Sequence, residues 1–150
     1  FDTYKFTHPL PDDLRRIAEQ TSGILLNWYL TDWTNTTNKI NYAINKVEQT
    51  NGKSKVTIER IGLMPMPLEV LVKYKDGTDE YYYIPISLMR GEKRQPTYAK
   101  SWRQLKDWSW AYKKYSFEIE SELDSIESID INPTGLIADI DNSNDKIIFD

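Results

Sequence analysis

Apolar and polar residues alternate along most of the chain beyond Lys39, and a period of two is typical of β-strands rather than helices. The dipeptides Asn51-Gly52 and Asp76-Gly77 separate runs of this kind. Each can supply the positive backbone φ that a tight hairpin turn needs. We expect strands within 40–46, 56–58, 68–74, 82–86, 115–119, 129–131 and 146–149. About seven short strands joined by turns predict an immunoglobulin-like antiparallel β-sandwich.

The stretch 90–107 breaks this alternation, because it is polar and irregular. We expect a long loop there, with one helical turn around 101–105. Its basic cluster of Arg90, Lys93 and Arg94 is interrupted by an acidic residue and is typical of a solvated loop. The net charge is −4, with 19 basic and 23 acidic residues spread along the chain. No nucleic-acid partner is therefore predicted.

The first forty residues follow a helical period instead, with Leu14, Ile17 and Ala18 at the i, i+3 and i+4 spacing of an apolar stripe. Pro11 suits the first position of a helix, and Asp12 and Asp13 favour the positive end of the helix dipole. Gly23 is a natural C-terminal stop. The sequence therefore predicts a helix over 11–22.

A second helix is predicted over 25–33, and it carries two apolar faces. One face has Leu26, Leu30 and Trp33, and the other has Leu25, Trp28 and Tyr29. Two apolar faces on so short a helix imply burial on two sides. Helices of this length are marginal in water, so the pair needs a partner surface.

The chain carries no catalytic constellation of its own. His8 is its only histidine, and there is no cysteine. A zinc peptidase site needs two helical histidines, a glutamate ligand and a general base, and a serine nucleophile needs a histidine base. The six glycines fit turns or caps rather than a phosphate loop. We predict no catalytic, cofactor-binding or metal-binding residue, and no membrane span.

The acidic stretch 139–145 allows two interpretations. Its oxygen-bearing side chains resemble the ligands of a calcium loop, although the glycine and terminal glutamate of a helix–loop–helix site are missing. These side chains are Asp139, Asp141, Asn142, Ser143, Asn144 and Asp145. The interpretation that we favour is an acidic turn in which Asn and Asp side chains cap backbone donors.

Two further features have a structural and a functional interpretation. The segment Met64-Pro65-Met66-Pro67 is either a rigid entry into the next strand, which we favour, or an exposed Met patch for a partner. A group of aromatic residues fills a core or an interface in the favoured interpretation, and forms a sugar-stacking platform in the other. The group is Trp102, Trp108, Trp110 and Tyr112.

Several segments resemble the aminopeptidase N family of zinc peptidases, chiefly its bacterial members. Phe6-Thr7-His8-Pro9-Leu10-Pro11-Asp12-Asp13-Leu14 is similar to the family's F-K-H-P-T-P-x-D-F. Ser22-Gly23-Ile24-Leu25-Leu26-Asn27-Trp28-Tyr29 is similar to S-G-x-x-L-D-W-F, and Trp33 matches a tryptophan that ends the same helix. The segments 40–46, 61–70, 76–77 and 129–133 resemble the sandwich that follows, in the same order.

This resemblance implies a layout for the chain. Residues 1–37 would be the last helices of a thermolysin-like, gluzincin-type catalytic domain, and 38–150 the immunoglobulin-like sandwich after it. The family's H-E-x-x-H helix, distal glutamate ligand, exopeptidase segment and catalytic tyrosine have no matching position here. The resemblance thus implies a non-catalytic C-terminal fragment that packs against and supports the catalytic domain. Zinc would lie in that upstream domain, whose parent removes N-terminal residues from peptides.

Rival functions remain at this point. One is a free-standing β-sandwich that binds carbohydrate or peptide, and another is a calcium-dependent adhesion-type domain. Because the chain starts at Phe1 rather than Met, we expect that something precedes it in a parent protein or that a leader was removed. The absence of cysteine is compatible with cytosol and periplasm alike, and we favour an exported or periplasmic location.

Overall fold

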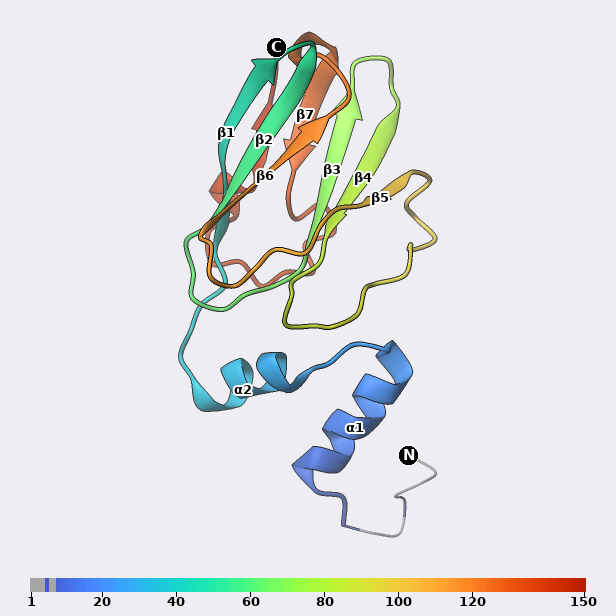
Figure 1. Cartoon of the computed structure of the whole chain (residues 1–150), viewed down its shortest axis with the longest axis vertical. Coiled ribbons are helices and arrows are strands. Elements are labelled where there is room, and N and C mark those ends of the chain that lie inside the picture. Colours follow the sequence, from blue (N-terminus) through green and yellow to red (C-terminus); the bar gives the residue numbers. More distant parts are fainter. Residues whose placement is uncertain (1–4, 6–7) are drawn as a thin grey trace.

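The computed structural model describes residue 5 and residues 8–150. Phe6 and Thr7, which belong to the first segment of the family resemblance, lie outside the described residues. Figure 1 shows two β-sheets lying one over the other, with both helices at one end and the C-terminus at the other.

Helix α1 runs from Pro11 to Ser22, as predicted. The carboxylate of Asp13 accepts a hydrogen bond from the backbone N–H of Leu10 at 3.0 Å, which satisfies a donor at the helix start. Gly23 takes the left-handed conformation, with φ 74°, and its N–H donates to the carbonyl of Glu19. The helix therefore ends where the glycine predicts.

Helix α2 spans Asn27–Asn35, so the predicted range of 25–33 is wrong by two residues at each end. The backbone N–H of Leu25 donates to the carbonyl of Met89 at 2.7 Å, and that of Leu26 donates to the Glu19 carboxylate at 2.8 Å. Both contacts reach outside the second helical segment. They hold the chain in a linker conformation, and the helix begins after them.

Within the described residues, eight strands form two sheets. Their bounds are β1 (Tyr42–Thr50), β2 (Lys53–Arg60), β3 (Leu68–Tyr74), β4 (Asp79–Ile84), β5 (Trp102–Gln104), β6 (Lys114–Ile119), β7 (Ile126–Asp130) and β8 (Lys146–Ile148). One sheet has the order β1-β2-β6 and the other β5-β4-β3-β7-β8. Short 3₁₀ turns at Leu123–Ser125 and Asn142–Asn144 precede β7 and β8. The prediction of a mainly β chain with two helices is confirmed.

Both predicted hairpin turns form. Asn51 and Gly52 join β1 to β2 with φ values of 52° and 76°, the positive signs of a type I′ turn. Gly77 joins β3 to β4 with φ 84°. Both hairpins point away from the helices, which places them at the far end of the sandwich (Figure 1).

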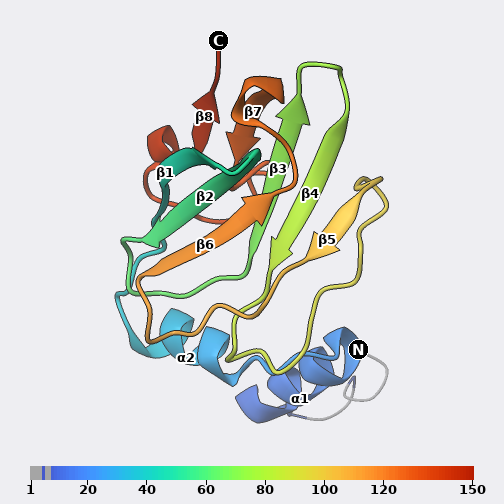
Figure 2. The same ribbon diagram turned by 45° about the horizontal axis from the view of Figure 1, so that its top comes forward.

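The predicted helical turn around 101–105 is wrong, because Trp102–Gln104 forms strand β5. It pairs with β4 in parallel, whereas every other named strand pair in the described residues is antiparallel. The ring of Trp102 stacks on that of Tyr83, with centroids 5.1 Å apart. Figure 2 shows β5 at the edge of its sheet, beside β4. A three-residue edge strand has too few positions to show alternation in the sequence.

The main core lies between the two sheets. Tyr82 of β4 and Phe117 of β6 meet across it, with ring centroids 5.1 Å apart. Val56 and Ile58 of β2 and Val70 of β3 are fully buried in the same cluster. In β2 the buried Val56 and Ile58 alternate with polar neighbours, which matches the predicted period of two.

Candidate interaction surface at the helical end

Four connections meet at the end of the sandwich that carries the helices. They are 61–67, 85–90, 105–113 and 131–140. Four backbone hydrogen bonds fix them to one another, to the start of β1 or to the end of β2: Ile61 N to Asn41 O (2.8 Å), Arg60 N to Lys113 O (2.8 Å), Ser87 N to Trp108 O (3.2 Å) and Ile140 N to Ile40 O (3.1 Å). Segments far apart in the sequence thereby form one end face.

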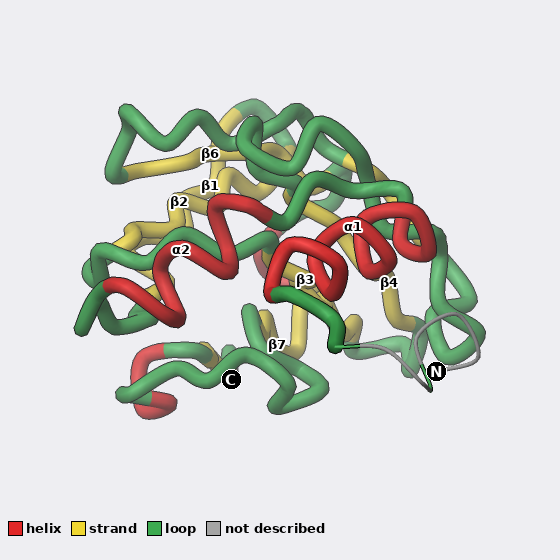
Figure 3. Tube along the Cα trace, turned by 90° about the horizontal axis from the view of Figure 1, so that it is seen from below, coloured by secondary structure: helices red, strands yellow, loops and turns green. Residues whose placement is uncertain are grey.

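The helices attach to this end through close backbone approach. A Cβ on Gly91 would lie 2.6 Å from the carbonyl oxygen of Gly23, so only glycine allows this contact. The hydrogen bond from Leu25 to Met89 lies beside it. Figure 3 shows both helices lying across the end of the sandwich.

Large exposed apolar side chains gather here. Among the described residues, all of them except Tyr98 and Ile148 lie on the helical segment or on the four connections. They are Leu10, Leu14, Ile17, Leu25, Trp33, Ile61, Leu63, Leu88, Trp110, Tyr112, Leu136 and Ile140. We call this set the helical-end surface. Exposed apolar side chains that gather at one end of a molecule make that end a candidate interaction surface.

Helix α1 contributes an exposed apolar part of the surface. Leu10 and Leu14 are each 68% exposed, and no residue of α1 is buried. These two side chains and Ile17 share one side of the helix start and line a groove together with Pro9 and Pro11. An apolar stripe on a helix normally faces a core. Here it faces outward.

Helix α2 is covered on one side only. Trp28 and Tyr29 pack against the core cluster, while Trp33 is exposed. The prediction that Leu25 shares the buried face is wrong, because Leu25 precedes the helix and is exposed. The expected burial on two sides is not seen within the described residues, because Trp28 packs against the core cluster whereas Trp33 is half-exposed.

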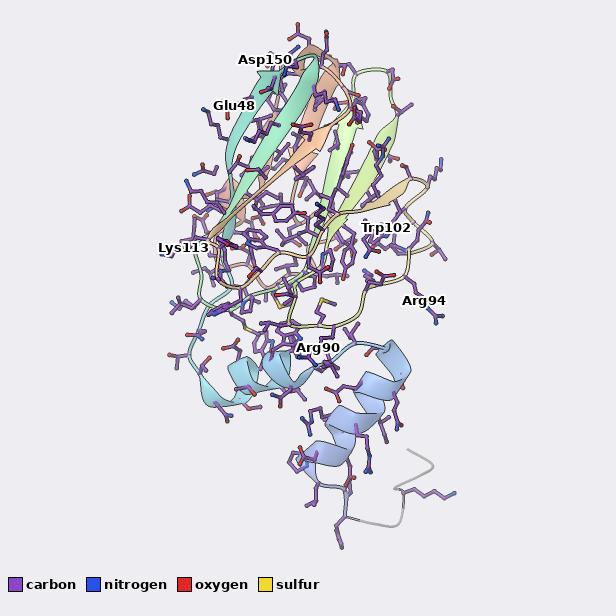
Figure 4. All side chains as sticks on the ribbon, viewed as in Figure 1. Glu48, Arg90, Arg94, Trp102, Lys113 and Asp150 are labelled. Carbon is purple, nitrogen blue, oxygen red and sulfur yellow. The ribbon has the colours of Figure 1, made fainter. Side chains whose placement is uncertain are left out.

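Basic side chains lie near the apolar positions. In Figure 4, Arg90 lies beside the helices and Lys113 toward the same end, whereas Glu48 and Asp150 lie at the far end. Of the predicted basic cluster, Lys93 pairs with the carboxylate of Glu69 on β3. That pairing is what a structural surface cation makes.

The aromatic group singled out in the sequence does not form one platform. Trp108 is buried in the core between Tyr42 and Tyr115. Trp102 stacks on the outer face of the five-stranded sheet, and Trp110 lies under the guanidinium of Arg60, 4.0 Å from its ring centroid. Because Trp108 is buried and Trp102 lies on β5, the four rings do not form the single exposed platform that sugar stacking would need.

The methionines of the segment Met64-Pro65-Met66-Pro67 are packed against the core rather than exposed. Met64 is buried, and Met66 is packed against the core cluster. The backbone N–H of Met66 donates to the hydroxyl of Tyr42 at 2.7 Å. These contacts match the prediction of a rigid entry into β3. His8 is exposed and belongs to no metal-ligand group among the described residues.

In the acidic stretch 139–145, the carboxylates of Asp139 and Asp141 accept hydrogen bonds from backbone N–H groups of the stretch itself and of β1. Asp139 accepts hydrogen bonds from Tyr42 N (2.8 Å) and Asp141 N (2.9 Å), and Asp141 accepts one from Ser143 N (3.2 Å). This is the capping arrangement that we favoured over a calcium loop. In residue 5 and residues 8–150, no three His, Asp or Glu side chains gather as metal ligands would.

Asp145 is the exception in this stretch, because its side chain is buried with Oδ1 unpartnered. Burial, reinforced by the negative charge of Asp139, raises the pKa of Asp145 to about 6. The folded protein therefore binds this proton more tightly than the unfolded chain does. This contribution to stability is complete below the unfolded pKa of 3.8 and is lost as the pH rises through about 6.

Replacing Asp145 with Asn is accordingly expected to raise the free energy of unfolding at pH 7 by about 1 kcal/mol, since the neutral amide removes the buried charge. The gain should vanish at acid pH, where Asp145 is protonated in both states. Urea unfolding of both proteins across this pH range measures it. A loss of stability at pH 7 would mean that the carboxylate has a favourable partner, such as a cation.

Comparison of the chain with known protein families, with curated proteins and with solved structures found no match in any of the three. Within the described residues, no helix combines the length and apolar character needed to cross a membrane.

Proposed function

We propose that the chain is a non-catalytic packing module of a larger protein, and that its helical-end surface docks against an adjoining catalytic domain. The single observation that supports this most strongly is the outward-facing apolar side of α1. In line with the family resemblance, the parent is a bacterial zinc aminopeptidase. The helices then belong to the end of its catalytic domain, and the sandwich is immunoglobulin-like.

The energetics favour a covered surface. Burying a Leu or Ile side chain is worth roughly 1.5–3 kcal/mol relative to leaving it exposed. Leu10, Leu14 and Ile17 together therefore offer several kcal/mol to a partner that covers them. In the described structure α1 contributes no buried residue, so it gains its packing energy only when that partner is present.

Replacing Leu14 with Glu tests the docking. In the isolated chain, the melting temperature should stay unchanged, because Leu14 is exposed there. In the longer polypeptide encoded by the same reading frame, the substitution should lower stability by about 2–3 kcal/mol, since it places a charge in a covered apolar contact.

The matched control is Ile148→Glu, on β8. Ile148 is 70% exposed but lies off the helical-end surface. The Ile148→Glu substitution should change stability by the same amount in both polypeptides. Equal effects of Leu14→Glu in the two contexts would contradict the docking proposal.

The zinc aminopeptidase assignment has its own test. We expect the purified chain to release no product from an aminoacyl p-nitroanilide, with or without added zinc, because the metal site and general base belong to the upstream domain. The reading frame upstream of Phe1 should encode H-E-x-x-H followed by a glutamate ligand. If the isolated chain hydrolysed the aminoacyl p-nitroanilide and a chelator abolished this activity, the assignment would be wrong.

A further inference from the structure

Arg60 is a cation placed inside the sandwich. It ends β2, directly opposite Tyr42 of β1, and is only 8% exposed. Its backbone N–H donates to the carbonyl of Lys113, which fixes it to the start of β6. An arginine side chain stays charged at any physiological pH, so burial here keeps a full positive charge out of water.

The Arg60 guanidinium has few hydrogen-bond partners and forms no ion pair among the described residues. Nη2 donates to the carbonyl of Trp110 at 3.0 Å, and the guanidinium carbon lies 4.0 Å from the centroid of the Trp110 ring. Nε is buried without a hydrogen-bond partner. Within the described part of the chain, no carboxylate forms an ion pair with Arg60. A buried cation without a counter-charge is strongly unfavourable.

The position of Arg60 connects this feature to the helical-end surface. Its side chain lines a narrow pocket with Tyr42, Trp108, Trp110 and Leu88. Trp110 and Leu88 belong to the helical-end surface, and Trp110 is 45% exposed. The pocket lies at the helical end, but its free volume of about 10 Å³ holds no more than a water molecule. A group from the adjoining domain therefore reaches the guanidinium only when the half-exposed Trp110 ring moves aside.

We propose that Arg60 receives a carboxylate, an Asp or Glu side chain of the domain that covers the helical-end surface. This inference rests on the proposed function and specifies the chemistry of the contact. The free Nε–H and the neighbouring Nη–H form a planar fork that a planar carboxylate can meet with two hydrogen bonds. The aromatic walls exclude water and so strengthen the pairing. No pattern in the sequence singles out Arg60.

Acetate is the minimal probe of this site. In ¹H–¹⁵N spectra of the full 150-residue chain, sodium acetate should shift the Arg60 Nε–H and Trp110 indole N–H signals saturably. Sodium chloride at equal ionic strength and neutral acetamide should not. The Arg60→Met variant should lose the acetate response of Trp110, and the Arg94→Met control, at an exposed arginine, should keep it.

If Arg60→Met does not fold, the Arg60→Lys variant provides the test. Lysine keeps the positive charge but lacks the planar fork, so acetate should shift the Trp110 signal less in this variant than in the unsubstituted chain. Absence of an acetate shift, an equal shift with chloride, or an undiminished response in the Arg60 variant that folds would overturn the inference. Context-dependent loss of stability in Leu14→Glu together with no acetate response would reject the Arg60 contact alone. Equal effects of Leu14→Glu in both contexts would reject the docking surface itself.

Discussion

Replacing Trp108 with Ala is expected to lower the free energy of unfolding by about 3–5 kcal/mol, the range for removing a large buried aromatic side chain. Trp108 is 4% exposed. Its ring lies 5.6 Å from that of Tyr42 and 5.4 Å from that of Tyr115, and its indole N–H donates to the Tyr112 carbonyl at 2.8 Å. The substitution removes all three contacts and leaves a cavity beneath the end face.

Trp110→Ala is the matched control, two residues along the same connection. Its ring is half-exposed and contacts the guanidinium of Arg60, so the expected cost is about 1 kcal/mol. Urea unfolding followed by circular dichroism compares the two. Equal costs would contradict the assignment of Trp108 to the core and Trp110 to the surface.

Gly62→Ala is the second change with a large expected effect. A Cβ at this position would lie 2.2 Å from the carbonyl oxygen of Lys39 and 2.6 Å from the backbone nitrogen of Asn41. Both neighbours are backbone atoms, which cannot rotate aside. The connection 61–67 must then move off the start of β1, and the hydrogen bond from Gly62 N to Asn41 O is lost. We expect a cost of about 3 kcal/mol.

Gly77→Ala provides the comparison, because its φ is 84° but no atom would contact the added Cβ. Here only the left-handed backbone is strained, at about 1 kcal/mol. Chemical denaturation of both variants measures the difference. A smaller loss for Gly62→Ala than for Gly77→Ala would show that the connection is not held against β1 as described.

Local patterns in the sequence predict much of this fold. Alternation located β2, β3 and β6, and the Asn51-Gly52 dipeptide located its turn, because both signals depend on near neighbours alone. The start of α1 at Pro11 and the glycine after its end are equally local. The parallel pairing of β5 depends instead on β4, some twenty residues away, and no local pattern specifies it.

Part of the helical-end surface could likewise be predicted from local sequence patterns, and part could not. The spacing of Leu14 and Ile17 in the sequence predicts an apolar stripe on α1, and the structure shows that nothing described covers it. Ile61 and Leu136 were not predicted, because single apolar residues in connections carry no periodic signal. These two residues belong to the helical-end surface because the strand order brings their connections to the same end of the molecule.

Hydrogen exchange gives the most direct test that the helical-end surface is covered in a parent protein. It compares the isolated chain, peptide by peptide, with the longer polypeptide that the proposal expects the same reading frame to encode. The docking account predicts slower exchange in the longer polypeptide for α1, Pro11–Ser22, and for the connections at the helical end. The hairpin turns at the far end should exchange equally in both. Equal exchange of α1 in the two polypeptides would contradict the account.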